Sequence, residues 1–137
     1  MDIKYGVNAE INPAELQRLF RQTGWASGRS LDGISRMLKH TYIHVSAWQG
    51  GRLVGFARAI TDTIYRAVVD DVVVDEEYRG RGIGTELMRR LGEELSGVEE
   101  VFLGCGTSEV PFYEKRGYKQ AHHPYMKRLN RRTDKPC

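Results

Sequence analysis

The chain has 137 residues, 40% of them hydrophobic and 28% charged, a composition typical of a soluble globular domain that folds without disulfides. A formal net charge of +3, from 21 basic and 18 acidic residues, is too small to indicate the dense basic surface of a nucleic-acid-binding protein. No apolar run reaches the length of a membrane span, and the first residues lack the apolar core of a signal peptide, so we expect a cytoplasmic protein. Cys105 and Cys137 are the only two cysteines and one is the last residue, so we expect no structural disulfide; neither has a partner at metal-ligand spacing, so we expect no metal site.

Capping residues and apolar spacing predict two helices and three strands in the first half of the chain. Asn12 followed by Pro13 is a typical helix start, Ser30 is a suitable cap for a second helix, and Gly50-Gly51 is a strong hairpin turn. The expected elements are a strand over residues 3–7, a helix from Pro13 with Leu16, Leu19 and Phe20 on its apolar face, a helix after Ser30 with Ile34, Met37 and Leu38 on its apolar face, and strands over residues 42–48 and 53–60.

The second half predicts a strand, a glycine-rich loop and a helix, followed by shorter elements. Val68–Val74 is a β-branched strand, and an acidic turn over residues 75–78 leads to the loop Arg79–Thr85. Expected next are a helix with Leu87, Met88, Leu91 and Leu95 on its apolar face, a strand over residues 101–103, a helix over residues 110–116 stopped by Gly117, and closing strands at Tyr118 and over residues 125–129.

The order β-α-α-β-β-β-α-β-α-β-β predicts one domain of the α/β (α+β) class over residues 1–130. Its sheet is expected to be mixed and mostly antiparallel, with about four flanking helices. Residues 131–137 are expected to form a solvated basic tail.

Glycines occupy every second position of the loop, at Gly80, Gly82 and Gly84. Without Cβ atoms, several backbone N–H groups can approach a ligand, and the following helix adds unsatisfied N–H groups and the positive end of its dipole. The loop therefore predicts a phosphate site. It is neither a P-loop, which needs G-x-x-x-x-G-K-[ST], nor the dinucleotide fingerprint G-x-G-x-x-G, because its glycines fall as G-x-G-x-G.

Residues 79–84, with the pattern R-x-x-G-x-G, resemble the acetyl-CoA signature [Q/R]-x-x-G-x-[G/A] of the GNAT superfamily of N-acetyltransferases. A second segment, F-Y-E-K-R-G-Y over residues 112–118, looks like that family's F-Y-x-x-x-G-[F/Y] motif. The order of the elements also fits, so the resemblance covers nearly the whole chain.

The resemblance implies that the N–H groups of the glycine loop hold the pyrophosphate of acetyl-CoA. It also implies that the strand ending at Val74 splays from its neighbour, so that its backbone pairs with the pantetheine arm. Many family members place a cofactor-binding Asn seven residues before the motif's tyrosine; that position is Gly106 here, and Thr107, Ser108 or the backbone could replace the Asn. The expected cofactor-binding residues are Val72, Val73, Val74, Arg79, Gly80, Arg81, Gly82, Ile83, Gly84, Thr85, Ser108 and Tyr113.

Acetyl transfer needs a base for the amine, a donor for the oxyanion and an acid for the departing thiolate. In the resembled family the tyrosine of the second motif is the acid, which implies this role for Tyr113; a phenol with a pKa near 10 is still protonated at neutral pH. Packing with Phe112 and Tyr118 is the alternative role for Tyr113. A backbone N–H near Val72 or Val73 is expected to meet the oxyanion.

Asp70 and Asp71 are the candidate bases, because two acids in a valine-rich strand are costly unless they face water, a partner or a cationic ligand. Neighbouring residues of a regular strand point to opposite faces, so we expect only one of them in the site, and a bulge could exchange them. We prefer Asp70, which lies where polyamine-type acetyltransferases carry an acid proposed to act through water. An ion pair, for example with Arg58, is the structural alternative for either.

The connection between the first two helices forms one wall of the acceptor site in resembling proteins, which makes Trp25 and Arg29 candidate substrate-binding residues. The run from Gly55 to Val74 also looks like the aralkylamine-acetylating branch of plants and cyanobacteria.

We therefore expect an acetyl-CoA-dependent N-acetyltransferase that modifies a primary amine, most simply a small molecule, without a metal, a nucleic-acid partner or a membrane. A protein or peptide N-acetyltransferase of the same fold and a non-catalytic acyl-CoA-binding module are the alternatives. Many resembling proteins pair through their C-terminal strands, so a homodimer is also expected.

Overall fold

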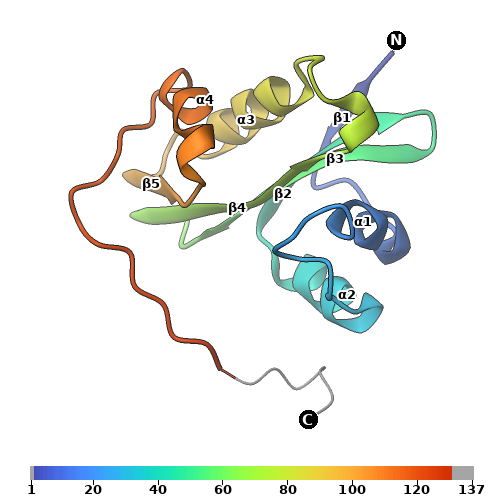
Figure 1. The fold of residues 1–137 in the computed structure, drawn as a ribbon, viewed down its shortest axis with the longest axis horizontal. Helices are drawn as coiled ribbons and strands as arrows, with labels where there is room; N and C mark the ends of the chain where they lie inside the picture. Colours follow the sequence, from blue (N-terminus) through green and yellow to red (C-terminus); the bar gives the residue numbers. More distant parts are fainter. Residues whose placement is uncertain (1, 131–137) are drawn as a thin grey trace. The chain divides into compact units, whose positions relative to one another are not determined.

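The computed structural model describes residues 2–130, which form two compact units, one ending at Gly104 and one beginning at Cys105. The first unit contains a mixed five-stranded sheet in the order β1-β2-β3-β4-β5, antiparallel from β1 to β4 and parallel between β4 and β5 (Figure 1). Its strands are β1 (Lys4–Val7), β2 (Ile43–Gln49), β3 (Arg52–Thr61), β4 (Arg66–Val74) and β5 (Glu100–Leu103). The α/β class and the mixed, mostly antiparallel sheet are thus confirmed.

Helices α1 (Pro13–Phe20) and α2 (Leu31–His40) lie on one face of the sheet and α3 (Ile83–Glu94) on the other (Figure 1). The two predicted helix starts are confirmed: Asn12 Oδ1 accepts from the Ala14 N–H at 2.9 Å, and Ser30 Oγ accepts from the Gly33 N–H at 3.0 Å. The core under α1 and α2 is built from buried apolar side chains, among them Leu16, Leu19, Phe20, Ile34, Phe56 and Val73.

Helix α3 packs directly on the backbone of β3 at Gly55. A Cβ added at Gly55 would lie 3.0 Å from Leu87, 3.1 Å from Ile83 and 3.3 Å from Ala47, closer than ordinary van der Waals contact. The absence of a side chain therefore lets the first turns of α3 approach the sheet. This places the start of α3 beside the end of β4, because Gly55 pairs with Val74.

The second unit contains a short 3₁₀ turn η2 (Thr107–Glu109) and helix α4 (Val110–Glu114). The predicted helix over residues 110–116 begins as expected and ends two residues early, before a turn in which Gly117 has φ +94°. The Tyr118 N–H closes this turn by donating to the Tyr113 carbonyl at 3.2 Å.

The predicted closing strands are wrong for the described residues: residues 118–130 form neither helix nor strand. Tyr125, Met126 and Leu129 are 85–88% exposed, so this segment buries no apolar face. A strand needs a partner for its backbone hydrogen bonds, and apolar residues alone do not supply one. The predicted basic tail over residues 131–137 lies outside the described residues. No helix among residues 2–130 is long and apolar enough to cross a membrane.

Candidate functional site

Strand β4 contains a bulge at its two aspartates. In the β3–β4 register Phe56 pairs with Val73 and Arg58 pairs with Asp70, so two residues of β4, Asp71 and Val72, stand opposite one residue of β3. Asp71 takes up the extra length in a left-handed conformation with φ +54°.

The bulge places both carboxylates on the face covered by α1 and α2, since both contact Arg58. The alternation of a regular strand predicted opposite faces for the two aspartates; the bulge that the sequence analysis allowed for replaces that alternation here. A regular strand would have turned Asp71 toward α3, and the bulge adds the residue that reverses it.

Asp71 is buried, and one of its two carboxylate oxygens is held by arginines while the other, Oδ1, has no hydrogen-bond partner among the described residues. Its Oδ2 accepts from Arg58 Nε at 2.6 Å and from Arg29 Nη1 at 2.9 Å, and its side chain is 1% exposed. Arg29 comes from the connection between α1 and α2, where its guanidinium lies over the Phe20 ring at 4.7 Å from the ring centroid. The ion pair between Arg29 and Asp71 therefore links this connection to β4, and the Asp71 carboxylate lies out of reach of solvent.

Asp70 is the accessible member of the pair. Its side chain is 48% exposed, its Oδ1 accepts from the Asp71 N–H at 2.9 Å, and its Oδ2 lies 3.7 Å from Arg58 Nη2. The Arg58 guanidinium is thus held mainly by Asp71. Asp70 keeps a fixed backbone contact and a carboxylate that solvent or a cation can reach.

Beyond Val69, strand β4 pairs on one side only. The β4–β5 register ends where Val69 meets Leu103, whereas β4 continues to Val74 and pairs there with Gly55 and Phe56 of β3. Residues 70–74 therefore have no strand partner on the β5 side among the described residues. The side chain of Val73 packs in the core while its strand keeps one open edge.

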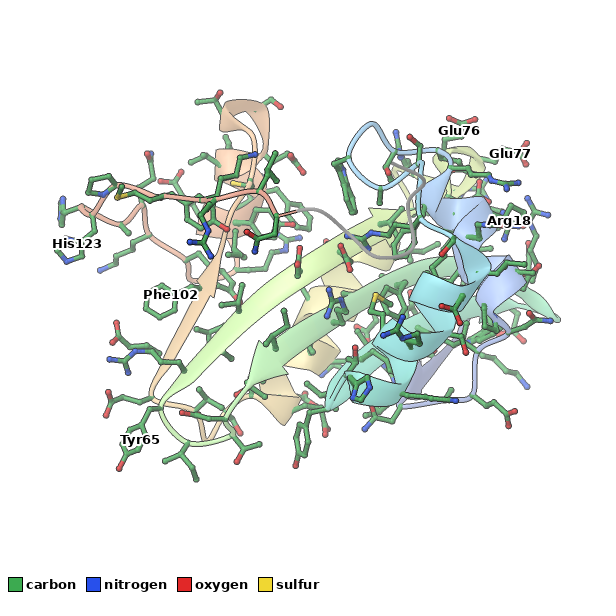
Figure 2. All side chains as sticks on the ribbon, turned by 90° about the horizontal axis from the view of Figure 1, so that it is seen from below. Arg18, Tyr65, Glu76, Glu77, Phe102 and His123 are labelled. Atoms are coloured by element: carbon green, nitrogen blue, oxygen red, sulfur yellow. The ribbon has the colours of Figure 1, made fainter. Side chains whose placement is uncertain are left out.

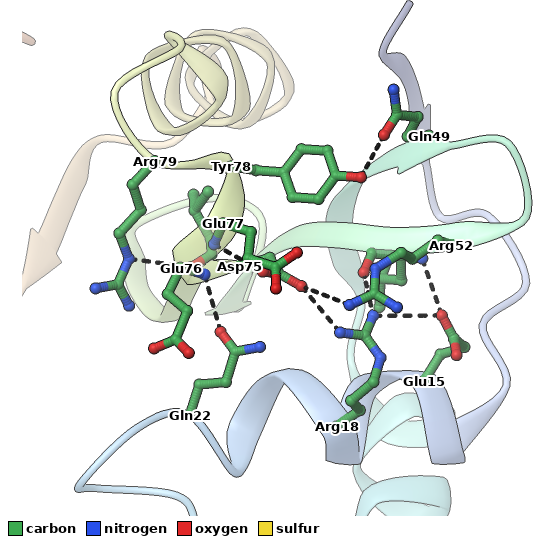
Figure 3. Close-up of polar contacts among 12 residues, drawn as sticks. Glu15, Arg18, Gln22, Gln49, Arg52, Asp75, Glu76, Glu77, Tyr78 and Arg79 are labelled. Atoms are coloured by element: carbon green, nitrogen blue, oxygen red, sulfur yellow. Dashed lines mark hydrogen bonds and ion pairs between the residues drawn. The ribbon is translucent and has the colours of Figure 1, made fainter. Parts of the chain in front are cut away.

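A buried carboxylate also stands at the other end of this open segment (Figure 3). Asp75 is 1% exposed, and its Oδ2 accepts from Arg18 Nη1 of α1 at 2.9 Å and from Arg52 Nη2 at 3.4 Å. Its Oδ1 caps the 3₁₀ turn η1 (Glu76–Tyr78) by accepting from the Glu77 N–H at 3.0 Å. Asp75 therefore fixes the point where β4 turns into the glycine loop.

Opposing effects act on the pKa of Asp75. Burial alone would raise it, but the Glu77 amide and the hydrogen bonds from Arg18 and Gln22 outweigh burial and hold the pKa below its usual value. The contacts of Asp75 with the two arginines were not predicted from the sequence. The sequence offers one signal for them, an acidic residue at the end of a valine-rich strand, in a position suited to capping the next turn.

The glycine loop has the open backbone that its pattern predicted. Gly80 and Gly82 have φ +78° and +81°, and a Cβ at either position would meet nothing within 4 Å. Gly82 is the N-cap of α3 and supplies no side-chain cap, so the first turn of a twelve-residue helix opens on this loop. Arg81 lies over the Tyr78 ring at 5.2 Å, and the Tyr78 hydroxyl donates to Gln49 (Figure 3).

Tyr113 is the buried aromatic residue of the second unit. Its ring meets Phe112 and Tyr118 edge-on, with centroid distances of 4.9 Å and 6.0 Å. Burial, and next the negative charge of Glu109, raises the pKa of Tyr113 to about 12, so the phenol stays protonated across the physiological range. Ser108 is exposed in η2, and the Gly106 N–H donates to Glu109 Oε1 at 3.2 Å.

Trp25, the second predicted substrate-binding residue, is partly packed and partly exposed. Trp25 is 56% exposed, with its ring edge-on to Phe20 at 6.2 Å, so one side of it is open to solvent. Within residues 2–130, no group of three His, Cys, Asp or Glu side chains is placed to hold a metal ion.

Comparison with known proteins identifies the family. Residues 40–120 match the acetyltransferase (GNAT) domain family. The chain is 33% identical over 110 residues to an uncharacterized N-acetyltransferase (ycf52-like) of Prochlorococcus marinus, a match that covers 76% of this chain and 61% of that protein. It is 33% identical over 114 residues to the chloroplastic serotonin N-acetyltransferase 2 of Oryza sativa subsp. japonica, covering 79% of this chain and 56% of the rice protein. The chain thus spans less than two thirds of either relative.

A solved acetyltransferase structure is similar to this chain over almost its full length. The crystal structure of a putative acetyltransferase from Deinococcus radiodurans superposes with a TM-score of 0.81 at 32% identity, covering 93% of this chain and 89% of that one. The resemblance carried by the two sequence motifs is therefore confirmed: the chain belongs to the GNAT family of acetyltransferases.

Proposed function

We propose that this chain transfers the acetyl group of acetyl-CoA to the primary amine of a small molecule. GNAT acetyltransferases use acetyl-CoA. The observation that supports transfer to an amine is the position of Asp70, a half-exposed carboxylate on β4 directly after the last residue that pairs with β5. A base is thus available beside an open strand edge. The printed name of the rice relative, a serotonin N-acetyltransferase, supports a small-amine acceptor.

The cofactor site we propose follows the open backbone of the first unit. The N–H groups from Arg79 to Thr85 would hold the pyrophosphate, because two glycines with positive φ leave the space above the loop empty. The open edge of Val72–Val74 would pair with the pantetheine arm as an added strand. Ser108 remains a proposed contact, in place of the Asn that Gly106 replaces.

The proposed chemistry divides three roles among this chain's groups. An alkylammonium has a pKa near 10.4, so about one molecule in 10³ is neutral at pH 7, and Asp70 would take its proton through water. A backbone N–H near Val72 or Val73 would face the negative charge that develops on the acetyl oxygen. Tyr113 would give its proton to the thiolate.

Gly82→Ala is expected to weaken acetyl-CoA binding at least tenfold. A Cβ at φ +81° is strained and projects into the open space above the loop, where the proposed phosphate contacts lie. Isothermal titration with acetyl-CoA measures the effect. The matched control is Gly92→Ala, an exposed helical position of α3, which should leave the affinity unchanged and slightly stabilise the fold. Equal affinities in the two variants would remove the loop from the cofactor site.

Tyr113→Phe is expected to lower kcat tenfold or more while leaving the fold intact, because it removes the proton donor and keeps the buried ring. With the pKa raised to about 12, the phenol stays protonated to high pH, so Tyr113 should impose no loss of kcat below about pH 11. A pH profile of kcat for both proteins is the measurement. An unchanged kcat in Tyr113→Phe would exclude the acid role.

Thiol release from acetyl-CoA tests the proposed function as a whole. The assay should compare aralkylamines, polyamines, aminoglycosides and amino acids with a panel of peptides bearing a free N-terminus or lysine. Release that depends on a small amine supports the proposal, and release with peptides alone assigns the chain to protein acetylation. Binding of acetyl-CoA without turnover in either panel would identify a non-catalytic module. A homodimer stays a prediction, to be checked by sedimentation equilibrium.

A further inference from the structure

Four charged side chains of alternating sign form a row on one face of the sheet, which we call the ion row: Arg29, Asp71, Arg58 and Asp70. Arg29 Nη1 and Arg58 Nε lie 2.9 Å and 2.6 Å from the same oxygen, Asp71 Oδ2, and the other end of the Arg58 guanidinium, Nη2, lies 3.7 Å from Asp70. Figure 2 views this face: α1 and α2 cover one part of it, and Phe102 lies on the uncovered part. The ion row thus begins in the connection between the two helices and ends at a half-exposed carboxylate.

The two arginines of the ion row share one carboxylate. Asp71 supplies one negative charge to two positive ones, so these three side chains keep one positive charge, and Asp70 is the carboxylate that faces it. The side chains of Arg29, Asp71 and Arg58 are 26%, 1% and 13% exposed. Solvent therefore screens this charge less than it screens the charge of a fully exposed arginine.

Arg29 is held in place by its own surroundings. Its carbonyl accepts from Gln17 Nε2 at 3.2 Å, and its N–H donates to the Ala26 carbonyl at 3.3 Å. Its guanidinium lies over the Phe20 ring at 4.7 Å from the centroid and donates to Asp71. The positive charge of Arg29 is therefore fixed beside the buried carboxylate of β4.

The other charged or titratable groups near the ion row add little charge to it. His44 of β2 pairs with Arg58 across the strands, is 7% exposed, and has a pKa lowered by burial, so it is neutral at pH 7. Farther along β4, Arg66 is balanced by Glu99 and Glu100 at 3.0 Å and 3.3 Å. The positive charge beside the exposed carboxylate therefore comes from the arginines of the ion row.

We propose that Arg29 is a positioning residue for the proton transfer: acting through the other members of the ion row, it keeps Asp70 ionised, and so able to accept a proton, at lower pH. A neighbouring positive charge favours the ionised form of a carboxylate. This proposal rests on the proposed function, in which Asp70 is the base. It gives Arg29 this role in place of the predicted contact with the acceptor.

The test removes the charge of Arg29 and follows the titration of Asp70 directly. Arg29→Gln leaves Asp71 and Arg58 to balance each other, so Asp70 then faces a neutral pair. NMR of the Asp70 carboxyl carbon, identified by its loss in Asp70→Asn, measures the titration midpoint without turnover. In Arg29→Gln the midpoint should move to higher pH by about half a unit, the size expected for one unit charge acting across an ion pair.

Three further variants separate charge from packing. Arg29→Met also removes the charge but keeps an unbranched stem over Phe20, so it serves in place of Arg29→Gln if that variant fails to fold. Arg29→Lys keeps the charge and should restore the wild-type midpoint. The matched control is Arg36→Gln on α2, which removes a positive charge that lies 3.6 Å from Asp32 and outside the ion row. Its midpoint should equal that of the wild type.

The pH profile of kcat/KM is the second measurement, because it reports the groups of the free enzyme that must be ionised. The acid side of the profile should shift to higher pH in Arg29→Gln by the same amount as the NMR midpoint. On the plateau at high pH, where Asp70 is ionised in both proteins, kcat/KM should agree within about twofold. In the Asp70→Asn background, Arg29→Gln should shift the profile no further.

A purely structural role for Arg29 gives a different pattern. Arg29→Gln would then unfold at lower urea concentration but keep the wild-type midpoint and profile, which would overturn the proposal. An equal shift in Arg36→Gln would also overturn it, because any lost positive charge would then have the same effect. A shifted midpoint with an unshifted profile in an active enzyme would exclude Arg29 from the proton transfer.

Failure of the proposed function is recognised separately. In that case the wild type acetylates no amine, and the NMR midpoint alone tests the ion row. A midpoint that moves in Arg29→Gln and returns in Arg29→Lys supports the effect of Arg29 on Asp70, and an unchanged midpoint overturns it.

Discussion

Asp71→Asn is expected to lower the free energy of unfolding by about 3 kcal/mol, at the lower end of the range for breaking a buried ion pair. The substitution leaves Arg29 without the carboxylate of Asp71 and Arg58 with only the more distant Asp70, and the side chains of Arg58 and Arg29 are only 13% and 26% exposed. Asn tolerates the left-handed conformation at this position, so the loss reports the charge and not the bulge. Urea unfolding followed by circular dichroism measures the change.

The neighbouring Asp70 is the control for this prediction. Asp70→Asn removes the charge of a side chain that is 48% exposed and 3.7 Å from Arg58, so its cost in stability should stay below about 1 kcal/mol. Asp71→Ala should cost more than Asp71→Asn, because Ala adds the strain of a positive φ to the lost charge. Similar losses at the two positions would show that the arginines are not anchored by Asp71.

Asp70→Asn is expected to lower kcat by about 10²-fold at pH 7, because an amide cannot take the proton of the ammonium. The thermodynamic cost at this exposed position is small, so the variant should fold and bind acetyl-CoA as the wild type does. Steady-state kinetics with the best acceptor from the amine panel provide the measurement. A kcat within threefold of the wild type would place the base elsewhere.

The pH dependence separates a base from a residue that only shapes the site. Raising the pH from 7 to 10 converts much of an alkylamine of pKa near 10.4 to its neutral form, so the need for a base falls. The defect of Asp70→Asn should therefore shrink steadily as the pH rises. A defect that stays constant across this range would contradict proton transfer and indicate a positional effect.

The features that depend on local spacing could be predicted from the sequence. The helix caps at Asn12 and Ser30 and the open glycines of the loop are local properties of the backbone, and the structure has them. The family followed from two short motifs, each of which is recognised from consecutive residues of the chain. These predictions required no knowledge of which strands pair.

The rest depends on pairing between distant segments. The bulge at Asp71 exists because β3 offers one residue where β4 offers two, and no pattern within β4 alone reveals this. The same applies to Asp75, whose arginine partners lie 57 and 23 residues away in the chain. The prediction of closing strands at Tyr118 and over residues 125–129 was wrong because an apolar pattern does not specify a partner.

The two buried aspartates have a joint consequence for the segment between them. Asp71 and Asp75 bracket Val72–Val74, and each is held by two arginines that come from other parts of the first unit. A strand with one unpaired edge would ordinarily sample many conformations, and a ligand that ordered it would lose affinity to that entropy. Because both ends are fixed during folding, the conformational entropy of this edge is lost before any ligand arrives. A ligand that pairs with this edge therefore does not have to order it, and its affinity is higher than for a mobile edge.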